Sequence, residues 1–223
     1  MATFRHEPSG RRFLFIHIPR TAGRFIETNL VMKNKFIWDD DYKKLGISKM
    51  YDSIENVEFG HFHREYYEKY LNVKGIPHIT IIRNPIDRFI SASLYINRMY
   101  GSCQELMEDE HYFYSMLENF PLTESISWYR PQLDYLTNKT HIWRFEDGFG
   151  KDFIHWLRDI IGIDQLKFDE NIKYNTSADE GYKLKRTPKL MNNIRHLYRK
   201  DIDQFYPDAH SDTKIQKRVR SVT

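Results

Sequence analysis

The chain has 223 residues, of which 40% are hydrophobic, and this is enough for one domain with a sizeable core. Its 34 basic and 31 acidic residues leave a net charge of +3, which argues against extensive nucleic-acid binding. The single cysteine, Cys103, excludes an intramolecular disulfide and a cysteine-based metal site. No stretch has the length of a signal peptide's apolar core or of a membrane span. We therefore expect a soluble, cytoplasmic protein, or a soluble fragment of something longer.

The first half of the chain alternates short apolar runs with helical patterns. Residues 1–11 are polar and predict a flexible N-terminus, and the apolar run over 12–18 predicts a strand. Apolar residues on one face predict a helix over 24–33. A short strand over 57–63 and a helix over 64–71 are expected next.

The second half begins with the most apolar strand, over 76–85, which is ended by Pro85. Its continuous apolar character is typical of a strand buried on both faces in a parallel sheet. A helix over 86–100 follows, with Asp87 in its first turn. The remaining predicted elements are a helix over 125–136 broken near Pro131, a strand over 140–145, a helix over 151–162 and one or two helices over 187–206.

This alternation of strands and helices predicts an α/β fold, a three-layer sandwich with a central parallel sheet. We expect one domain over residues 12–206. Residues 207–223 include several lysines and arginines and are expected to form a basic C-terminal tail.

The polar loop Pro19, Arg20, Thr21, Ala22, Gly23 connects the first strand to the first helix. Backbone N–H groups at such a turn and the positive end of the helix dipole both favour an anion. The Thr21 hydroxyl adds a donor, and Arg20 adds positive charge, as does Arg24 just beyond the loop. The pattern predicts a phosphate-type site, although an ordinary strand–helix turn with solvated arginines is the alternative.

A second strand–helix junction repeats this architecture at Arg83, which ends the strand, and Ser91, which lies on the following helix. An arginine and a serine in this arrangement can hold one phosphate from two sides. The alternatives are a structural salt bridge of Arg83 with Asp87 or Asp134, and a small residue at 91 selected for close packing.

Both junctions resemble sequences of one family. FIHIPRTAGRFIE, residues 15–27, resembles the 5′-phosphosulfate loop of sulfotransferases, usually His-Ile-Pro-Lys-Thr-Gly/Ala-Gly-Thr-Ser after hydrophobic residues. IRNPIDRFISASLY, residues 82–95, resembles their 3′-phosphate motif. FGHFH, residues 59–63, is similar to the His-Gly-His stretch of the heparan sulfate 2-O-sulfotransferase branch, and YKLKRTPK, residues 182–189, resembles the basic loop that closes over the nucleotide.

The resemblance implies a sulfotransferase with a fold like that of P-loop nucleotide kinases. Its donor would be 3′-phosphoadenosine 5′-phosphosulfate (PAPS), and no metal would be required. The acceptor would be a hydroxyl, or less commonly an amine, and by family analogy a sugar hydroxyl. The implied donor-binding residues are Pro19, Arg20, Thr21, Ala22, Gly23, Arg24, Phe25, Arg83, Ser91, Tyr182, Lys185, Arg186 and Thr187.

The catalytic residues implied by the resemblance are His61, as the base, and Arg20, on the phosphate and bridging oxygens of the donor. His63 joins them, because it would point the same way as His61 on a strand. A zinc site at this pair lacks an evident third ligand. His17 is interpreted as a hydrogen-bonded core histidine. WYRPQLDYL, residues 128–136, resembles an acceptor-side segment, which implies acceptor or nucleotide contacts from Arg130 and Gln132; Trp128 and Tyr129 could equally be core.

The sequence departs from the family at Arg20, where lysine is usual, and at Arg24 and Phe25, which replace small hydroxyl residues. Arginine preserves a charged clamp but cannot donate its proton to a leaving group. Two further hypotheses therefore remain. One is a catalytically weak module that binds a nucleotide or an anionic glycan, and the other is an ATP-dependent kinase of related fold, although the Lys-Ser/Thr of its phosphate loop is missing.

Acceptor specificity is expected in the loops over residues 34–56 and 100–127, which carry no interpretable motif. The branch that the histidine stretch resembles usually carries an N-terminal membrane anchor in eukaryotes. Since no such segment is present in the sequence, a bacterial or viral source, or a trimmed chain, is expected.

Overall fold

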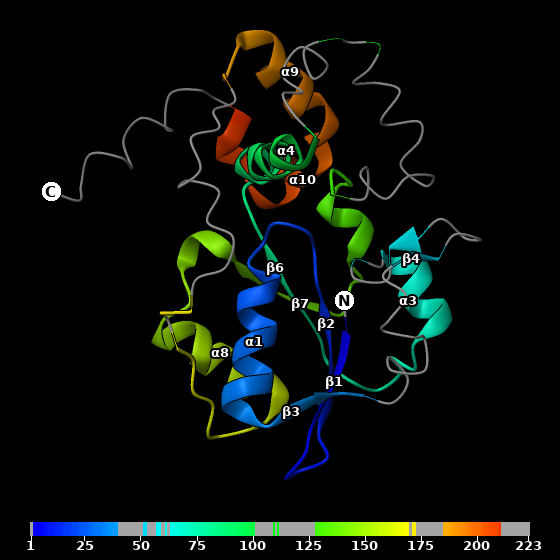
Figure 1. Cartoon of the computed structure of the whole chain (residues 1–223), viewed down its shortest axis with the longest axis vertical. Helices are drawn as coiled ribbons and strands as arrows, with labels where there is room; N and C mark the ends of the chain where they lie inside the picture. Colours follow the sequence, from blue (N-terminus) through cyan, green and yellow to red (C-terminus); the bar gives the residue numbers. More distant parts are fainter. Residues whose placement is uncertain are drawn as a thin grey trace, which may run out of the picture.

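A five-stranded sheet forms the centre of the protein, in the order β3-β1-β2-β6-β7 (Figure 1). The computed structural model describes residues 2–39, 51–52, 57–58, 61, 63–100, 109, 111, 128–169, 171–172 and 185–210. The strands are β1 (Ala2–His6), β2 (Arg12–Ile16), β3 (Phe36–Trp38), β6 (His78–Ile82) and β7 (Thr140–Arg144). A separate antiparallel pair joins β4 (Tyr51–Asp52) to β5 (Val57–Glu58).

The sheet is parallel in its central part, where β2 pairs with β6 and β6 pairs with β7. Its other edge is antiparallel, because β1 runs against both β2 and β3. The predicted α/β fold is thus confirmed, and the antiparallel edge is an addition that the sequence patterns did not indicate.

The prediction of a flexible N-terminus over residues 1–11 is wrong, because Ala2–His6 forms β1. The strand and β2 make a hairpin, and Gly10 closes its turn with φ +69° and a 2.8 Å hydrogen bond from its N–H to the His6 carbonyl. Phe4 is completely buried and stacks on Phe13. The buried ring of Phe4 and the pairing of β1 with both β2 and β3 therefore order this segment, although its sequence is largely polar.

Helices cover both faces of the sheet, as strand alternation requires. Phe13 and Phe15 face one side, where they pack in one core cluster with α1 (Gly23–Asn34) and α8 (Lys151–Ile161). Leu14 and Ile16 face the opposite side and belong to a second core cluster. That cluster includes residues of α3 (Arg64–Tyr70), α4 (Pro85–Tyr100), α9 (Pro188–Leu197) and α10 (Arg199–Phe205).

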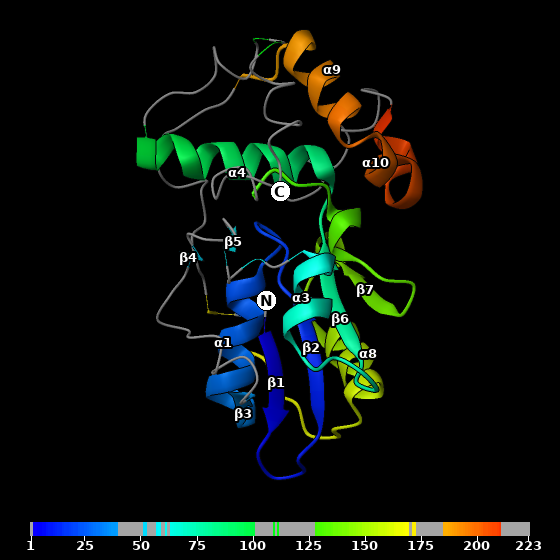
Figure 2. The ribbon, with the colours of Figure 1, turned by 90° about the vertical axis from the view of Figure 1, so that its right-hand side faces the viewer.

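Figure 2 shows that α4 lies across one end of the sheet, with α9 and α10 beyond it. Local signals set the starts of these helices. Asn84 accepts hydrogen bonds from the backbone N–H groups of Ile86 and Asp87 before α4, and Thr187 caps α9 in the same way. A proline stands at the first position of each helix. The predicted helices at 24–33, 64–71, 86–100, 151–162 and 187–206 are confirmed, the last as two helices.

Two predicted elements are shorter than expected. Of the strand predicted over 57–63, Val57–Glu58 forms β5, residues 59, 60 and 62 lie outside the described part of the chain, and His61 lies in a 3-10 turn. Within the predicted helix over 125–136, residues 125–127 lie outside the described part of the chain, and the rest contains only the 3-10 helix η2 (Gln132–Tyr135). The carboxylate of Asp201 accepts hydrogen bonds from the backbone N–H groups of Gln132 and Leu133, so a distant residue fixes this short helix.

The C-terminal tail was expected to begin at residue 207, but Pro207–His210 forms a further 3-10 helix, η5. The Ala209 side chain is buried in the core cluster that contains α10. The remainder of the predicted tail, residues 211–223, lies outside the described residues. The 3-10 helix η3 (Phe145–Asp147) follows β7.

Candidate active site

The two predicted phosphate loops lie side by side because β2 and β6 are adjacent parallel strands. The loop after β2 spans residues 17–22 and leads into α1, and residues 83–84 lead from β6 into α4. Both loops lie at the carboxyl ends of their strands, which is where α/β sheets bind ligands. Figure 2 shows α4 crossing this end of the sheet. Two residues of α4, Ser91 and Tyr95, contact the Arg20 side chain of the first loop.

Arg20, Arg83 and Ser91 come together at this junction. The Nε of Arg20 donates to Ser91 Oγ at 3.0 Å, and Nη1 of Arg83 donates to the Arg20 carbonyl at 3.3 Å. Ser91 thus contacts Arg20, where the sequence analysis paired it with Arg83. The carboxylates weighed as partners of Arg83 pair elsewhere: Asp87 with Arg186 at 3.0 Å and Asp134 with Arg130 at 3.3 Å.

The two guanidinium groups form a region of positive charge that is largely withdrawn from water. Burial, together with the neighbouring charge of Arg83, lowers the pKa of Arg20 to about 10. Burial also lowers the pKa of Arg83, whose guanidinium lies 4.5 Å from the ring centroid of Phe145. Both groups stay charged at neutral pH, and an anion placed between them would offset the repulsion.

The backbone of the first loop is strained at two positions. Arg20 and Ala22 have φ values of +66° and +71°, in the left-handed region that residues other than glycine rarely adopt. The Thr21 side chain is buried, and its hydroxyl donates to the Ile18 carbonyl at 2.8 Å. The hydroxyl predicted to bind phosphate therefore donates within the loop, which leaves the backbone N–H groups and the Arg20 side chain as the loop's donors toward an anion.

Two predicted donor-binding side chains lie apart from this cluster. Phe25 packs with Phe149 and Phe168, at centroid distances of 5.1 and 6.1 Å, in the core beside α8. Arg24 is exposed on the first turn of α1. The replacement of small hydroxyl residues at these positions thus puts an aromatic ring into the core and a charge on the surface.

Arg88 is a buried connector that the sequence analysis did not single out. It is completely buried, and its guanidinium donates to the carbonyls of Pro19, Trp128 and Arg130 at 3.5, 3.1 and 2.6 Å. The ring of Tyr198 lies 5.3 Å away. One side chain therefore ties the loop after β2 to residues 128–130. Its signal was present as the second arginine of the 82–95 motif.

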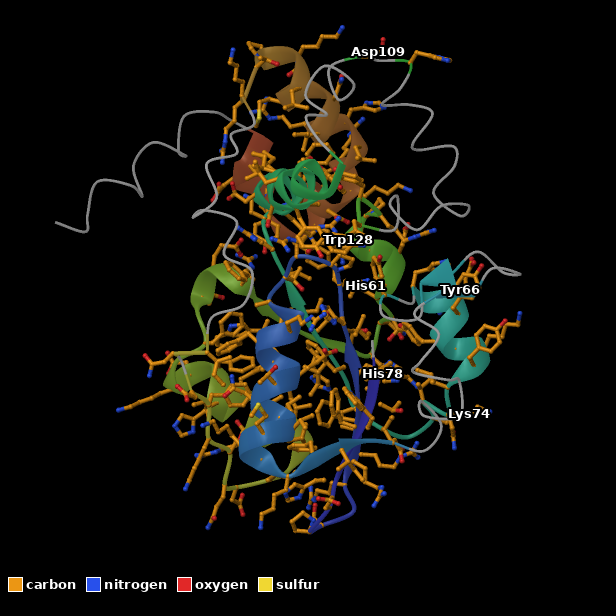
Figure 3. The ribbon with its side chains drawn as sticks, in the orientation of Figure 1. His61, Tyr66, Lys74, His78, Asp109 and Trp128 are labelled. Carbon is orange, nitrogen blue, oxygen red and sulfur yellow. The ribbon has the colours of Figure 1, made fainter. Side chains whose placement is uncertain are left out.

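His61 is surrounded by aromatic rings that lead back to Arg20. Its ring centroid lies 4.8 Å from that of His17 and 5.6 Å from that of Trp128. Trp128 stacks on Tyr95 at 4.6 Å, and the guanidinium of Arg20 lies 5.0 Å from the Tyr95 ring centroid. Figure 3 shows His61 and Trp128 close together at the end of the sheet below α4. A series of ring contacts thus connects the candidate base to the candidate donor clamp.

His63 occupies a different environment from His61, contrary to the expectation that the two would share a strand face. It directly precedes α3, and its ring lies 4.6 Å from that of Tyr66. Burial lowers its pKa to about 4, and the charge of Arg130 contributes in the same direction. In the part of the chain that the structure describes, no three His, Cys, Asp or Glu residues are grouped closely enough to hold a metal ion.

Gln132 braces the donor site from inside the protein. It is completely buried, its Oε1 accepts from the backbone N–H of Arg83 at 2.9 Å, and its Nε2 donates to the Arg83 carbonyl at 2.9 Å. Its amide is therefore committed to the backbone of Arg83. Arg130 is also buried, at 9% exposed, with Nη1 directed to Asp134. Both side chains had been expected from the sequence to contact the acceptor or the nucleotide.

The basic loop over 182–189 is described only from Lys185 onward, so Tyr182 lies outside the described residues. Arg186 pairs with Asp87 in the first turn of α4, which places this loop beside Arg83. Thr187 accepts from the Leu190 N–H at 3.3 Å and begins α9. Lys185 is exposed.

Comparison with known proteins agrees with this arrangement. A model of the sulfotransferase family matches residues 4–159, which include both strand–helix junctions and His61. The chain belongs to the sulfotransferase family. No curated protein and no solved structure gave a match. Sulfuryl transfer is therefore the general chemistry that family membership supports. None of the described helices of this sulfotransferase is both long and apolar enough to span a bilayer.

Proposed function

We propose that the protein transfers a sulfuryl group from PAPS to a hydroxyl group of a carbohydrate. An amine is the less favoured acceptor group. The observation that carries this proposal is the convergence of Arg20, Arg83 and Ser91 at the carboxyl ends of β2 and β6. The resemblance of residues 59–63 to the heparan sulfate 2-O-sulfotransferase branch supports a sugar hydroxyl over other acceptors.

The residues at this junction fit a ligand that carries two separate anionic groups. Arg20 and Arg83 are two partly buried cations, and the Ser91 hydroxyl lies beside Arg20. PAPS would supply an activated sulfuryl group on its 5′-phosphate, and its 3′-phosphate gives it the second anionic group. Since the sulfuryl donor lacks β- and γ-phosphates, the longer kinase loop with its magnesium-binding Ser/Thr is not needed.

Arg20 would act as a fixed positive clamp. Its pKa, although lowered to about 10, leaves it protonated at neutral pH, so it can stabilise negative charge but cannot supply a proton. The backbone N–H groups of Thr21, Ala22 and Gly23 would hold the 5′-phosphate at the start of α1. Arg83 would hold the 3′-phosphate together with Ser91, whose Oγ accepts from Nε of Arg20 and which can therefore still donate its O–H to the phosphate. Arg186 would add charge from the side of α9.

His61 would take the proton of the acceptor hydroxyl. A histidine can accept a proton near neutral pH, and the ring lies beside the Trp128–Tyr95 stack that reaches Arg20. From this position, His61 would contact an acceptor that lies next to the sulfuryl donor. His63, with its lowered pKa and its contact with Tyr66, would line the acceptor side without taking the proton.

The test is transfer of labelled sulfate from PAPS to a panel of desulfated glycans. We predict that His61→Ala reduces turnover by roughly 10²- to 10⁴-fold, because it removes the base. The affinity for the product nucleotide 3′,5′-ADP should change by less than about threefold, since the donor clamp is intact. His141→Ala, at an exposed position of β7, is the matched control and should keep full activity. Undiminished turnover in His61→Ala would overturn the assignment of the base.

A second candidate function is a module that binds a nucleotide or an anionic glycan without turnover. The arginine at position 20 favours it, because a lysine is usual there in the family. A wild-type protein that binds 3′,5′-ADP but transfers no sulfate to any acceptor of the panel would favour this module over the enzyme.

A further inference from the structure

We propose that Glu27 and His17 form a positioning pair behind His61, which orients its ring and stabilises its protonated form. This inference rests on the proposed function, in which His61 accepts the acceptor's proton. From the sequence alone, His17 was expected to be a core histidine, and Glu27 had no predicted role.

The first support is the hydrogen bond that joins His17 and Glu27. The Nδ1 of His17 lies 3.1 Å from Oε1 of Glu27, and the two side chains are only 12% and 22% exposed. Burial disfavours the charged form of Glu27, but the attraction and hydrogen bond of His17 outweigh it, and the pKa of Glu27 falls to about 2. Burial lowers the pKa of His17 to about 4. At neutral pH the pair is therefore a carboxylate that accepts a hydrogen bond from Nδ1–H of a neutral imidazole.

The second support is that the His17 ring has little freedom to move. A Cβ added to Gly23 would lie 2.0 Å from Cδ2 and from Nε2 of His17, so the ring packs directly on the first residue of α1. Glu27 holds the ring at Nδ1, and Phe15 lies 6.0 Å away between centroids. Against this fixed ring stands His61, at 4.8 Å and an interplanar angle of 76°.

The third support is electrostatic. When His61 gains a proton it becomes a cation in a partly buried site, where charges interact more strongly than in water. Glu27 is the carboxylate whose interaction with His61 favours that cation. His17 is neutral at neutral pH and Trp128 is uncharged, so neither ring opposes that attraction. Removal of the Glu27 charge should therefore make protonation of His61 less favourable.

The decisive experiment is an NMR titration of the whole protein with ¹³C-labelled histidines, in which the His61 signal is assigned by its loss in His61→Gln. We expect Glu27→Gln to lower the pKa of His61 by roughly half a unit to one unit, because the nearby negative charge is gone. Glu68→Gln, at an exposed carboxylate of α3, is the matched control and should leave that pKa unchanged. A second variant, His17→Phe, keeps a ring against Gly23 but removes the hydrogen bond that keeps the buried Glu27 ionised. Burial then favours neutral Glu27, so the His61 pKa should change in the same direction as in Glu27→Gln.

A kinetic measurement separates positioning from simple structural damage. Glu27→Gln should lower kcat by roughly two- to tenfold, because a base with a lower pKa accepts the proton less readily, and should move the acid limb of the pH profile downward by the size of the pKa shift. The affinity for 3′,5′-ADP should stay within about twofold, because neither residue belongs to the donor clamp.

The two proposals fail in different ways. If the wild-type protein transfers no sulfate, the proposed function fails, while the NMR titration still decides whether Glu27 acts on His61. If transfer is found but the His61 pKa is the same in the wild type and in both folded variants, Glu27→Gln and His17→Phe, the positioning pair is overturned.

Discussion

Arg20 and Arg83 extend from loops that directly follow two neighbouring strands, β2 and β6, whereas His61 and Trp128 come from segments outside the central sheet. The donor side is therefore fixed by the sheet itself, since adjacent parallel strands bring their carboxyl ends together. The side of the candidate base is fixed by contacts between side chains distant in sequence, such as His17 with His61 and Trp128 with Tyr95. This difference indicates that substitutions which displace the base should leave the donor clamp in place. Substitutions that displace the donor clamp and leave the base in place should be rare.

The largest effect is expected at Arg88, which links the donor side to the side of the candidate base. Arg88 donates to Pro19 on the donor side and to Trp128 and Arg130 on the other. We predict that Arg88→Met lowers the free energy of unfolding by about 3 kcal/mol or more, because three buried carbonyls lose a charged donor. Urea denaturation measures the change. Arg199→Met, at a side chain that is 77% exposed, should lie within about 0.5 kcal/mol of the wild type. If Arg88→Met changed the free energy of unfolding by as little as Arg199→Met, Arg88 would not stabilise the contact between the two sides.

Acid should weaken the base side before it affects the donor arginines. The folded protein holds His17 with a pKa of about 4, against an ordinary value of 6.5, so between these values the unfolded chain binds a proton that the folded chain does not. The free energy of unfolding should therefore fall as the pH decreases from 6.5 toward 4, by about 2 kcal/mol from His17 alone at pH 5. His63, whose pKa is also lowered, adds to the same trend.

Urea denaturation at a series of pH values measures this slope. His17→Phe should reduce it, and a substitution of the exposed His141 should not. A slope that is the same in His17→Phe and in the wild type would show that His17 does not titrate as its burial requires.

The smallest effect is expected at the rim of the donor side. Arg186 and Asp87 form an ion pair in which both side chains are more than 40% exposed, so Arg186→Ala should change the free energy of unfolding by less than about 1 kcal/mol. The affinity for 3′,5′-ADP should fall by roughly five- to tenfold, and by less at high salt, because an exposed charge is screened. Lys139→Ala, at an exposed position before β7, is the control. Unchanged nucleotide affinity in Arg186→Ala would remove this loop from the donor site.

Much of the fold was predictable where the signal is local. The apolar runs that form β2 and β6 and the Asn84-Pro85 and Thr187-Pro188 helix starts carry their own structural preferences. The strand β1 was not predictable in this way, because its polar residues become ordered only through pairing with β2 and β3. Nor was the short helix η2, which depends on the carboxylate of Asp201 far along the chain.

The same division holds in the site. Arg20, Arg83 and Ser91 were found from their position after strands, and the structure brings them together. The inward commitment of Gln132 and the pairing of His17 with Glu27 depend on how distant or successive elements pack, which periodicity does not record. Tyr95 and Arg88 lie within the motif over 82–95, so the motif pointed to their region but not to their contacts.

The central claim, that the two adjacent loops form the donor site, is tested most directly by calorimetric titration with 3′,5′-ADP beside ATP and magnesium. We predict micromolar binding of 3′,5′-ADP, weak binding of ATP, and a loss of affinity of roughly 30- to 100-fold in Arg83→Ala, because a charged hydrogen-bond donor to phosphate contributes about 2–3 kcal/mol. No binding of 3′,5′-ADP, or tight binding of ATP that needs magnesium, would contradict the assignment of these loops to a sulfuryl donor.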